Sequence, residues 1–443
     1  MPRTTAELLE ELFDFIRIPS ISSGDGDDAD LLRAAEWVCA RVIDAGGIAG
    51  IVETQKNPLA VGTITCGRVG APHLLVYGHY DVQTVAPLEA WDSPPFQPEV
   101  RDGYLYARGA SDDKGNFHCL LASLVDLARE GELDCDVTVV SDGEEEIGGD
   151  SVVRWLDAQE ARYDAALVFD SALVSEGWPL LTIGVRGVIT GRVRVVTGVR
   201  DVHSGLYGGA ALNAAHVLAT LIEGTRARNG LIPEALRADV REPSPEEVAS
   251  WATLPPGAGE LAVGGIAPLD PDAARDFYRR TFALPTFDVN AITCRDASQH
   301  RTIIPCEATA AISLRLVPDQ TVEKVWAALV EHFDGLAPEG ATIELERWGA
   351  SAGCAFDPSL PPLQIARRVL AEAFGHECAV ARTGGAIPLV SALHRHGVPT
   401  ILSGVAMVDD NVHAPNERIK LSNYEAGVRA ARLLFRELAA LSP

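Results

Sequence analysis

Apolar positions in the first 170 residues recur either at helical intervals or in unbroken runs of strand length. The helical intervals predict helices at 5–17, 29–45, 115–130 and 150–160. The unbroken runs predict strands at 59–64, 73–82, 104–109, 137–146 and 165–171. Because strands and helices alternate, we expect an α/β layer built on a largely parallel sheet.

The pattern changes near residue 183 and returns near residue 360. Between these points, residues 187–198 alternate like a half-exposed strand, and 209–226 indicate a helix rich in small residues. Residues 230–272, rich in Pro, Gly and charge, indicate loops and helices. A second βαβ-like set is predicted from 308–318, 320–334 and 342–348. The first pattern resumes with a helix at 362–374, a strand within 397–404 and a closing helix at 422–440.

These changes predict two domains, one inserted into the other. The first domain is expected to consist of residues 1–185 and 349–443, and the insert of residues 186–348. A chain of 443 residues is long enough for two domains of ordinary size.

Charge narrows the choice of partners. The chain carries 62 Asp and Glu against 37 Lys and Arg, a net charge of −25. Nucleic acid and anionic membranes attract basic surfaces, so neither is expected as a partner. Most of the acidic residues are expected to be solvated, and bound cations would balance others. No run of 18 apolar residues is free of charge, so no membrane-spanning helix is expected.

The cysteines and the N-terminal segment bear on the compartment. The eight cysteines are scattered and form no CxxC pair, which favours buried free thiols over a disulfide framework. The first residues, MPRTTAELLEELFDF, lack the basic start and apolar stretch of a secretory signal. The cytoplasm is therefore the expected compartment.

Candidate ligands follow the predicted strands, at the edge where open α/β sheets bind ligands. The first motif, GHYDV, contains His79 and Asp81. Two residues apart on a strand, these side chains point to the same side. Asp81 is then placed to bind the second ring nitrogen of a metal-bound His79. The alternative is a histidine in an ordinary polar turn.

Four further motifs carry acidic residues or a histidine: RGASDDKGN with Asp112 and Asp113, SDGEEEIGG with Glu144, Glu145 and Glu146, VFDSAL with Asp170, and NVHAPNERI with His413. Taken singly, each has a simpler explanation. The aspartates would cap helices or strands, the glutamates would be a solvated charge run, and the histidine would lie in a loop.

Together, these motifs match a two-metal site on one α/β layer. Mixed nitrogen and oxygen ligands suit Zn²⁺, Mn²⁺ or Co²⁺. The common alternatives are absent, since the chain contains no HExxH, GxSxG, P-loop or GxGxxG motif.

The order and approximate spacing of eight motifs resemble the M20 family of dinuclear metallopeptidases, and in particular its carnosinase-like dipeptidase branch. The motifs are GHYDVQ, RGASDDKG, DGEEEIGG, VFDSAL, DVHSGLYGG, IPCEATAAISLRLVP, TGGAIP and HAPNERI. The resemblance covers essentially the whole chain, less clearly 230–285. It implies a phosphorylase/hydrolase-like catalytic domain interrupted by a smaller α+β lid and dimerisation domain.

The resemblance also assigns metal ligands. It implies that His79 and Asp170 bind one ion, that Glu146 and His413 bind the other, and that Asp112 bridges them. Both ions are expected to be Zn²⁺, with Mn²⁺ or Co²⁺ as the alternatives.

Further roles follow from the same resemblance. Asp81 would orient His79, and Glu145 would be the general base that holds the attacking water. The peptide bond between Asp112 and Asp113 is expected to be cis.

Substrate contacts are expected from the inserted domain and one loop. By the resemblance, His203 stabilises the oxyanion and comes from a partner subunit, which implies a homodimer through the insert. Arg315 would bind the substrate carboxylate, helped by backbone N–H groups of Gly384, Gly385 and Ala386. The family often has Ser where this chain has Ala386. The polar Thr302 is a further candidate contact.

Simpler explanations remain open for two of these residues: His203 as a turn histidine and Arg315 as a surface strand arginine. The function expected is hydrolysis of dipeptides, or release of C-terminal residues from short peptides. Hydrolysis of N-acyl or N-succinyl amino acids is the first alternative, and a non-catalytic binding protein on the same scaffold is the second.

Overall fold

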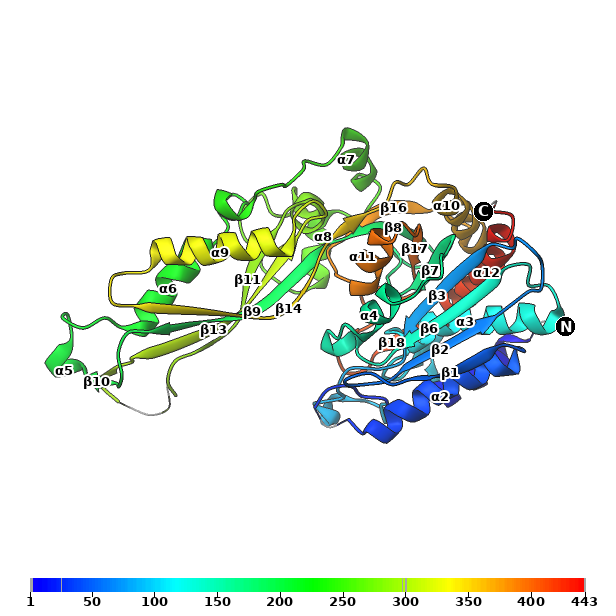
Figure 1. Ribbon diagram of the computed structural model, residues 1–443, viewed down its shortest axis with the longest axis horizontal. Coiled ribbons are helices and arrows are strands. Elements are labelled where there is room, and N and C mark those ends of the chain that lie inside the picture. Colours follow the sequence, from blue (N-terminus) through cyan, green and yellow to red (C-terminus); the bar gives the residue numbers. More distant parts are fainter. Residues whose placement is uncertain (1–2, 25, 297, 299–300, 442–443) are drawn as a thin grey trace. The chain divides into compact units, whose positions relative to one another are not determined.

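The computed structural model describes residues 3–24, 26–296, 298 and 301–441 (Figure 1). The chain divides into two compact units. The first unit comprises Met1–Ile183, Phe356–Ala381 and Ala392–Pro443. The second comprises Gly184–Ala355 and Arg382–Ser391. The catalytic and lid roles that the sequence suggested for these parts stay predictions.

The main sheet has nine strands in the order β1-β2-β6-β3-β7-β17-β8-β15, with β16 paired to β8. Its strands are β1 (Ile48–Val52), β2 (Leu59–Ile64), β3 (His73–His79), β6 (Asp136–Asp142), β7 (Ala165–Phe169), β8 (Leu180–Val185), β15 (Cys354–Ala355), β16 (Ala379–Thr383) and β17 (Thr400–Ser403). The central strands β6, β3, β7 and β17 are parallel, and antiparallel pairs flank them. The α/β fold class is confirmed.

Helices cover this sheet, and three short strands form a separate small sheet. The helices are α1 (Thr5–Ile16), α2 (Asp28–Asp44), α3 (Lys114–Glu130), α4 (Ser151–Asp157), α10 (Pro361–Phe374), α11 (Pro388–Arg395) and α12 (Leu421–Leu438). The small sheet contains β4 (Glu99–Arg101), β5 (Tyr104–Tyr106) and β18 (Arg418–Lys420). Helix α3 packs on β3 and β7, and α12 packs on α3 and α10. None of the described helices is long and apolar enough to cross a membrane.

The apolar runs explain the central strands. Leu74, Leu75 and Val76 of β3 are all fully buried, as expected for a parallel strand covered on both faces. Strand β3 pairs with β6 residue by residue, so His79 lies opposite Asp142 at the carboxyl ends of both strands. The sheet therefore brings polar side chains together at that edge.

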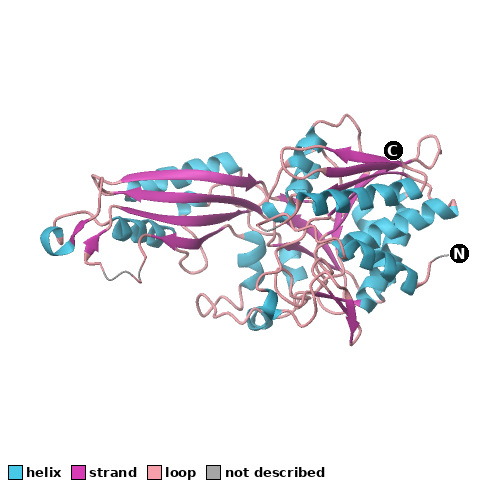
Figure 2. Ribbon diagram, turned by 90° about the horizontal axis from the view of Figure 1, so that it is seen from below, coloured by secondary structure: helices cyan, strands magenta, loops and turns pink. Residues whose placement is uncertain are grey.

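The second unit contains a four-stranded antiparallel sheet in the order β11-β13-β9-β14. Its strands are β9 (Gly187–Val196), β11 (Thr286–Thr293), β13 (Glu307–Leu316) and β14 (Thr342–Ser351), and a two-stranded sheet joins β10 (Val202–His203) to β12 (Ile303–Ile304). The helices are α5 (Ser204–Tyr207), α6 (Ala214–Thr225), α7 (Pro245–Trp251), α8 (Gly257–Val263) and α9 (Val322–Leu336). Helices α6 and α9 pack on strands of the four-stranded sheet (Figure 2).

Burial along β9 alternates residue by residue, as the sequence pattern predicted, and burial along β13 alternates in the same way. Strands β13 and β14, joined by α9, both run antiparallel to β9, which lies between them. The βαβ-like set is therefore present, with one strand inserted between its two parallel members.

Candidate metal centre

The candidate ligands gather where the central strands of the first unit end. His79 closes β3, and Asp170 directly follows β7. Asp112 and Asp113 lie in the loop between β5 and α3, and His413 lies in the loop before β18.

His79 is fully buried and held on both sides of its ring. Its Nδ1 lies 3.0 Å from the backbone oxygen of Asp81 and 3.3 Å from the Asp81 carboxylate. Its Nε2 lies 3.0 Å from Asp112 Oδ1. Burial lowers the pKa of His79, but the Asp112 and Asp81 carboxylates outweigh this effect and raise it well above its usual range. A ring oriented in this way presents Nε2 toward Asp112.

Asp112 contacts both histidines, one with each carboxylate oxygen. Its Oδ2 lies 2.9 Å from His413 Nε2, which also lies 3.0 Å from Glu146 Oε2. Hydrogen bonds to Asp112 and Glu146 raise the pKa of His413 to about 10. The peptide bond between Asp112 and Asp113 is cis, as the motif resemblance implies. The Asp112 carboxylate thus lies between two groups of ligand atoms.

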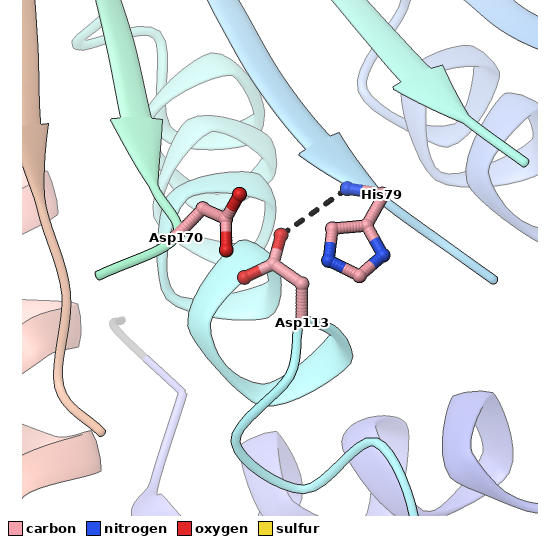
Figure 3. Close-up of side chains that lie close together, drawn as sticks. All are labelled: His79, Asp113 and Asp170. Atoms are coloured by element: carbon pink, nitrogen blue, oxygen red, sulfur yellow. Dashed lines mark hydrogen bonds between the residues drawn. The ribbon is translucent and has the colours of Figure 1, made fainter. Parts of the chain in front are cut away.

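Asp113 is a residue whose position the sequence did not resolve. It precedes α3, yet its side chain makes no capping hydrogen bond. Instead its Oδ2 accepts a hydrogen bond of 3.1 Å from the backbone N–H of His79. Its carboxylate faces that of Asp170 (Figure 3). His79, Asp113 and Asp170 form one potential metal-binding group, with ligand atoms within 4.8 Å of one another.

A second potential metal-binding group consists of Asp112, Glu146 and His413. Glu146 is fixed by its neighbours: its backbone N–H donates to Asp81 Oδ2 at 3.1 Å, and Gln83 Nε2 donates to its Oε2 at 3.0 Å. Asp81 therefore contacts one member of each group, His79 through its ring and Glu146 through its backbone.

The three consecutive glutamates have different environments. Glu144 is buried and accepts hydrogen bonds from Thr54, Asn57 and Ser151, so it anchors the turn. Glu145 begins the short 3-10 turn Glu145–Ile147, and no hydrogen bond or ion pair from the described residues holds its carboxylate. Burial, reinforced by nearby carboxylates, raises the pKa of Glu145 to about 8. Glu145 is therefore the free carboxylate of the three.

Glu417 is a structural contributor that the sequence reasoning missed. Its fully buried carboxylate accepts N–H bonds from Gly109, Ser111 and Asp112 at 2.8 to 3.0 Å. It also pairs with Arg108 at 2.8 Å. The signal was present in HAPNERI, but only the tertiary fold places this glutamate beneath the loop that carries Asp112.

The excess of negative charge at this site shows whether its residues fit metal ions. Six acidic side chains gather here, Asp81, Asp112, Asp113, Glu145, Glu146 and Asp170, and two histidines face them. Burial raises the pKa of both Asp113 and Asp170 well above the usual range.

Buried oxygens in this group also lack partners. Asp113 Oδ1 and Glu146 Oε1 have no hydrogen-bond partner among the described residues. Buried carboxylates need a cation, a hydrogen bond or a proton to offset their desolvation. Two divalent cations would supply the missing positive charge, so the donor set fits a dinuclear centre.

The second unit contains the remaining predicted residues. His203 is exposed at the end of β10, and its Nδ1 accepts a hydrogen bond from the N–H of Gly205 at 3.0 Å. Thr302 lies beside it, because the Thr302 carbonyl accepts bonds from both Ser204 N and Ser204 Oγ at 3.0 Å. These two candidate residues are neighbours.

Arg315 lies on β13, half-buried and opposite Val188 of β9. Gly385 and Ala386 lie in the loop after β16. The carbonyl of Gly385 accepts a hydrogen bond of 3.0 Å from the backbone N–H of Arg186. Arg186 was not singled out in the sequence.

Comparisons with known proteins agree with this geometry. The cysteinylglycine-S-conjugate dipeptidase of Corynebacterium striatum is 30% identical over 409 residues, covering 89% of this chain and 87% of that protein. The Beta-Ala-His dipeptidase of Homo sapiens is 25% identical, covering 82% of this chain and 74% of that protein. The crystal structure of the M20 family metallo-carboxypeptidase Sso-CP2 from Sulfolobus solfataricus superposes with a TM-score of 0.89 at 25% identity, covering 98% of this chain and 100% of that one.

The family model described as Peptidase family M20/M25/M40 matches residues 75–437, which is most of the chain. The resemblance inferred from the sequence motifs is confirmed, and the chain belongs to peptidase family M20/M25/M40.

Proposed function

We propose that this peptidase hydrolyses dipeptides at a centre of two divalent metal ions. The observation that carries the proposal is a pair of neighbouring ligand groups, His79 with Asp113 and Asp170, and Asp112 with Glu146 and His413. Asp112 links them, because one of its oxygens contacts His413 and the other contacts His79 of the first group. One ion would be held by His79, Asp170 and Asp112, and the other by Glu146, His413 and Asp112. The mixed donors favour Zn²⁺, with Mn²⁺ and Co²⁺ as the alternatives.

Bound at this place, the ions would polarise the scissile carbonyl and lower the pKa of the attacking water. The protein's own contribution centres on Glu145. Its carboxylate is free of hydrogen bonds from the described residues, and its raised pKa suits a group that takes up a proton near neutral pH. We infer that Glu145 removes the proton of the water and passes it to the leaving amine. Asp81 keeps the His79 ring in place throughout.

The second unit would supply the substrate contacts. We assign His203 to the oxyanion, Arg315 to the substrate carboxylate, and the backbone of Gly385 and Ala386 to the same carboxylate. Thr302 would be a polar contact beside His203. An arginine suits this role because its planar guanidinium matches a carboxylate in two hydrogen bonds.

Assembly and compartment complete the proposal. We infer a homodimer through the inserted unit, with His203 acting across subunits, and a cytoplasmic location. All eight cysteines are free in the structure, which agrees with a reducing compartment. If light scattering shows that the active protein is a monomer, the role of His203 across subunits is contradicted.

The substrate proposal is tested with a panel of dipeptides, N-acetyl amino acids and N-succinyl amino acids. Metal-loaded protein is expected to turn over dipeptides with the highest kcat/KM. Turnover restricted to the acyl amino acids would contradict the dipeptidase proposal and favour an amidohydrolase. Absence of turnover on the whole panel in metal-loaded protein would contradict hydrolysis of both substrate classes.

A further inference from the structure

Arg186 connects the start of β9 to the glycine loop after β16. Its side chain is only 8% exposed. Its Nε donates to the carbonyl of Gly384 at 3.1 Å, and its backbone N–H donates to the carbonyl of Gly385 at 3.0 Å. Its Nη1 donates to the carbonyl of Leu284 at 3.3 Å. The guanidinium thus binds two neutral carbonyls, of which that of Gly384 lies in the loop, and the backbone N–H of Arg186 holds the next peptide group of the loop.

Neither Arg186 nor Arg315 forms an ion pair with a described residue. Burial and the positive charge of Arg315 together lower the pKa of Arg186 to about 10, and the Asp288 carboxylate opposes this shift. Burial also lowers the pKa of Arg315. In a chain with a net charge of −25, two neighbouring arginines without ion pairs are unusual. Arg382 of the same unit differs, because it pairs with Glu247.

The loop held by Arg186 also leaves a hydrogen-bond donor free. A trans peptide group directs its C=O and N–H to opposite sides. Because the Gly385 carbonyl faces the Arg186 N–H, the N–H of Ala386 in the same peptide group points away from Arg186. It has no partner among the described residues. A Cβ on Gly384 would lie 3.1 Å from Arg186 Nη2, so a side chain there would crowd the guanidinium.

We propose that Arg186 is a positioning residue for an anion site formed by Arg315 and the N–H of Ala386, and that the site takes the free α-carboxylate of the substrate. Arg186 fixes the loop through the Gly384 carbonyl and adds positive charge beside Arg315. The inference rests on the proposed function for the identity of the occupant. It adds a residue that no motif in the sequence indicated.

The experiment compares a dipeptide with its C-terminal amide, which lacks the carboxylate charge. Binding is measured by calorimetry in a metal-loaded Glu145→Gln background, so that the result does not depend on turnover. We expect the background protein to bind the acid more tightly than the amide. Adding Arg186→Met is expected to reduce this preference about tenfold, since a charge-assisted contact and the loop geometry are lost. Arg186→Lys, which keeps the charge, should retain part of it.

In otherwise wild-type enzyme, Arg186→Met should raise KM for the dipeptide more than it lowers kcat, with a smaller effect on the amide. Arg382→Met is the matched control, because that arginine is paired with Glu247, and it should leave the preference unchanged. An unchanged acid preference in Arg186→Met, with the folded state intact by circular dichroism, would overturn the inference. Equal binding of acid and amide by the Glu145→Gln background would also overturn it. By contrast, a wild-type enzyme that turns over no dipeptide refutes the proposed function while the binding comparison still tests Arg186.

Discussion

In the first unit, the carboxylates around Asp112 outnumber the two histidines that face them, whereas in the second unit Arg186 and Arg315 form no ion pair with any residue that the structure describes. The first region contains acidic groups whose oxygens lack partners, and the second contains guanidinium groups bound only to carbonyls or free. In the second unit the Asp288 carboxylate offsets part of this positive charge without forming an ion pair with either arginine among the described residues. The difference in sign indicates different ligands: divalent cations in the first unit and an anion in the second.

Removal of metal is expected to have the largest effect, on both the activity and the stability of the acidic first unit. Exhaustive chelation should abolish hydrolysis and lower the unfolding temperature, since the carboxylates of the first unit lose their counter-charge. Metal present at about a thousandfold excess over its dissociation constant adds about 4 kcal/mol of stability. Calorimetric unfolding with and without Zn²⁺, Mn²⁺ or Co²⁺ measures this difference. Full activity in protein that elemental analysis finds free of metal would refute the dinuclear centre.

Replacement of Glu145 by Gln is the next largest expected effect. Loss of the base should lower kcat by about two to four decades, because general-base catalysis contributes that much. Metal content should remain at the wild-type level, since His79, Asp112, Glu146, Asp170 and His413 are untouched. Rapid-kinetic assays combined with elemental analysis separate the two effects. Near-normal turnover would remove Glu145 from its role, and lost metal would make it a ligand instead.

Replacement of Glu417 tests whether metal affinity depends on the hydrogen bonds that hold the loop carrying Asp112. Glu417→Gln should weaken metal binding by about 10- to 100-fold, because it removes acceptor capacity from the loop that carries Asp112. Competition with a fluorescent chelator measures the affinity. Asp136→Asn is a suitable control, since this carboxylate also accepts a backbone N–H, from Cys66, but lies at the opposite end of β6. Equal affinities in wild type and Glu417→Gln would show that Asp112 needs no such support.

The sequence predicted most of the fold because burial and strand pairing coincide in the main sheet. The predicted strand 59–64 has the bounds of β2. The strand predicted at 73–82 ends at His79, although Tyr80 and Val82 are fully buried. Those apolar residues lie in a buried loop, where burial continues after the pairing of β3 has ended. An apolar run therefore indicates burial more reliably than it indicates the end of a strand.

The candidate site was predictable where its residues follow strand ends or match family motifs. His79 and Asp170 belong to this group, because the parallel sheet determines where their strands end. The contacts of Glu417 and Arg186 were not predictable. Glu417 binds the N–H of Asp112 across 305 positions of sequence, and Arg186 binds Gly384 across 198. Neither spacing carries a local pattern, so only the tertiary structure reveals the interaction.

The smallest expected effect is on the pH dependence of stability, and it comes from a buried histidine that lies away from the metal ligands. This histidine can be compared with His79. His118 on α3 is fully buried, and its Nδ1 lies 2.8 Å from the hydroxyl of Tyr424. Burial, with the positive charges of Arg3 and Arg41, lowers the pKa of His118 to about 3. Unlike His79, this ring faces a single carboxylate, Glu11, whose Oε1 lies 4.0 Å from Nε2, and burial together with Arg3 and Arg41 keeps the ring neutral in the folded protein.

The sign of the pH effect follows from this depressed pKa. The unfolded chain protonates His118 near pH 6.5, so its contribution to stability is complete above that pH and is lost as the pH falls toward about 3. Within this window, wild type should lose up to about 1.4 kcal/mol per pH unit relative to His118→Phe. Urea unfolding of chelated protein at several pH values measures the difference without metal. Tyr424→Phe removes the hydrogen bond but keeps the ring buried, so it should retain the wild-type slope. A pH-independent difference between wild type and His118→Phe would mean that His118 is charged when folded, and that burial without a ligand does not suffice to keep a histidine neutral here.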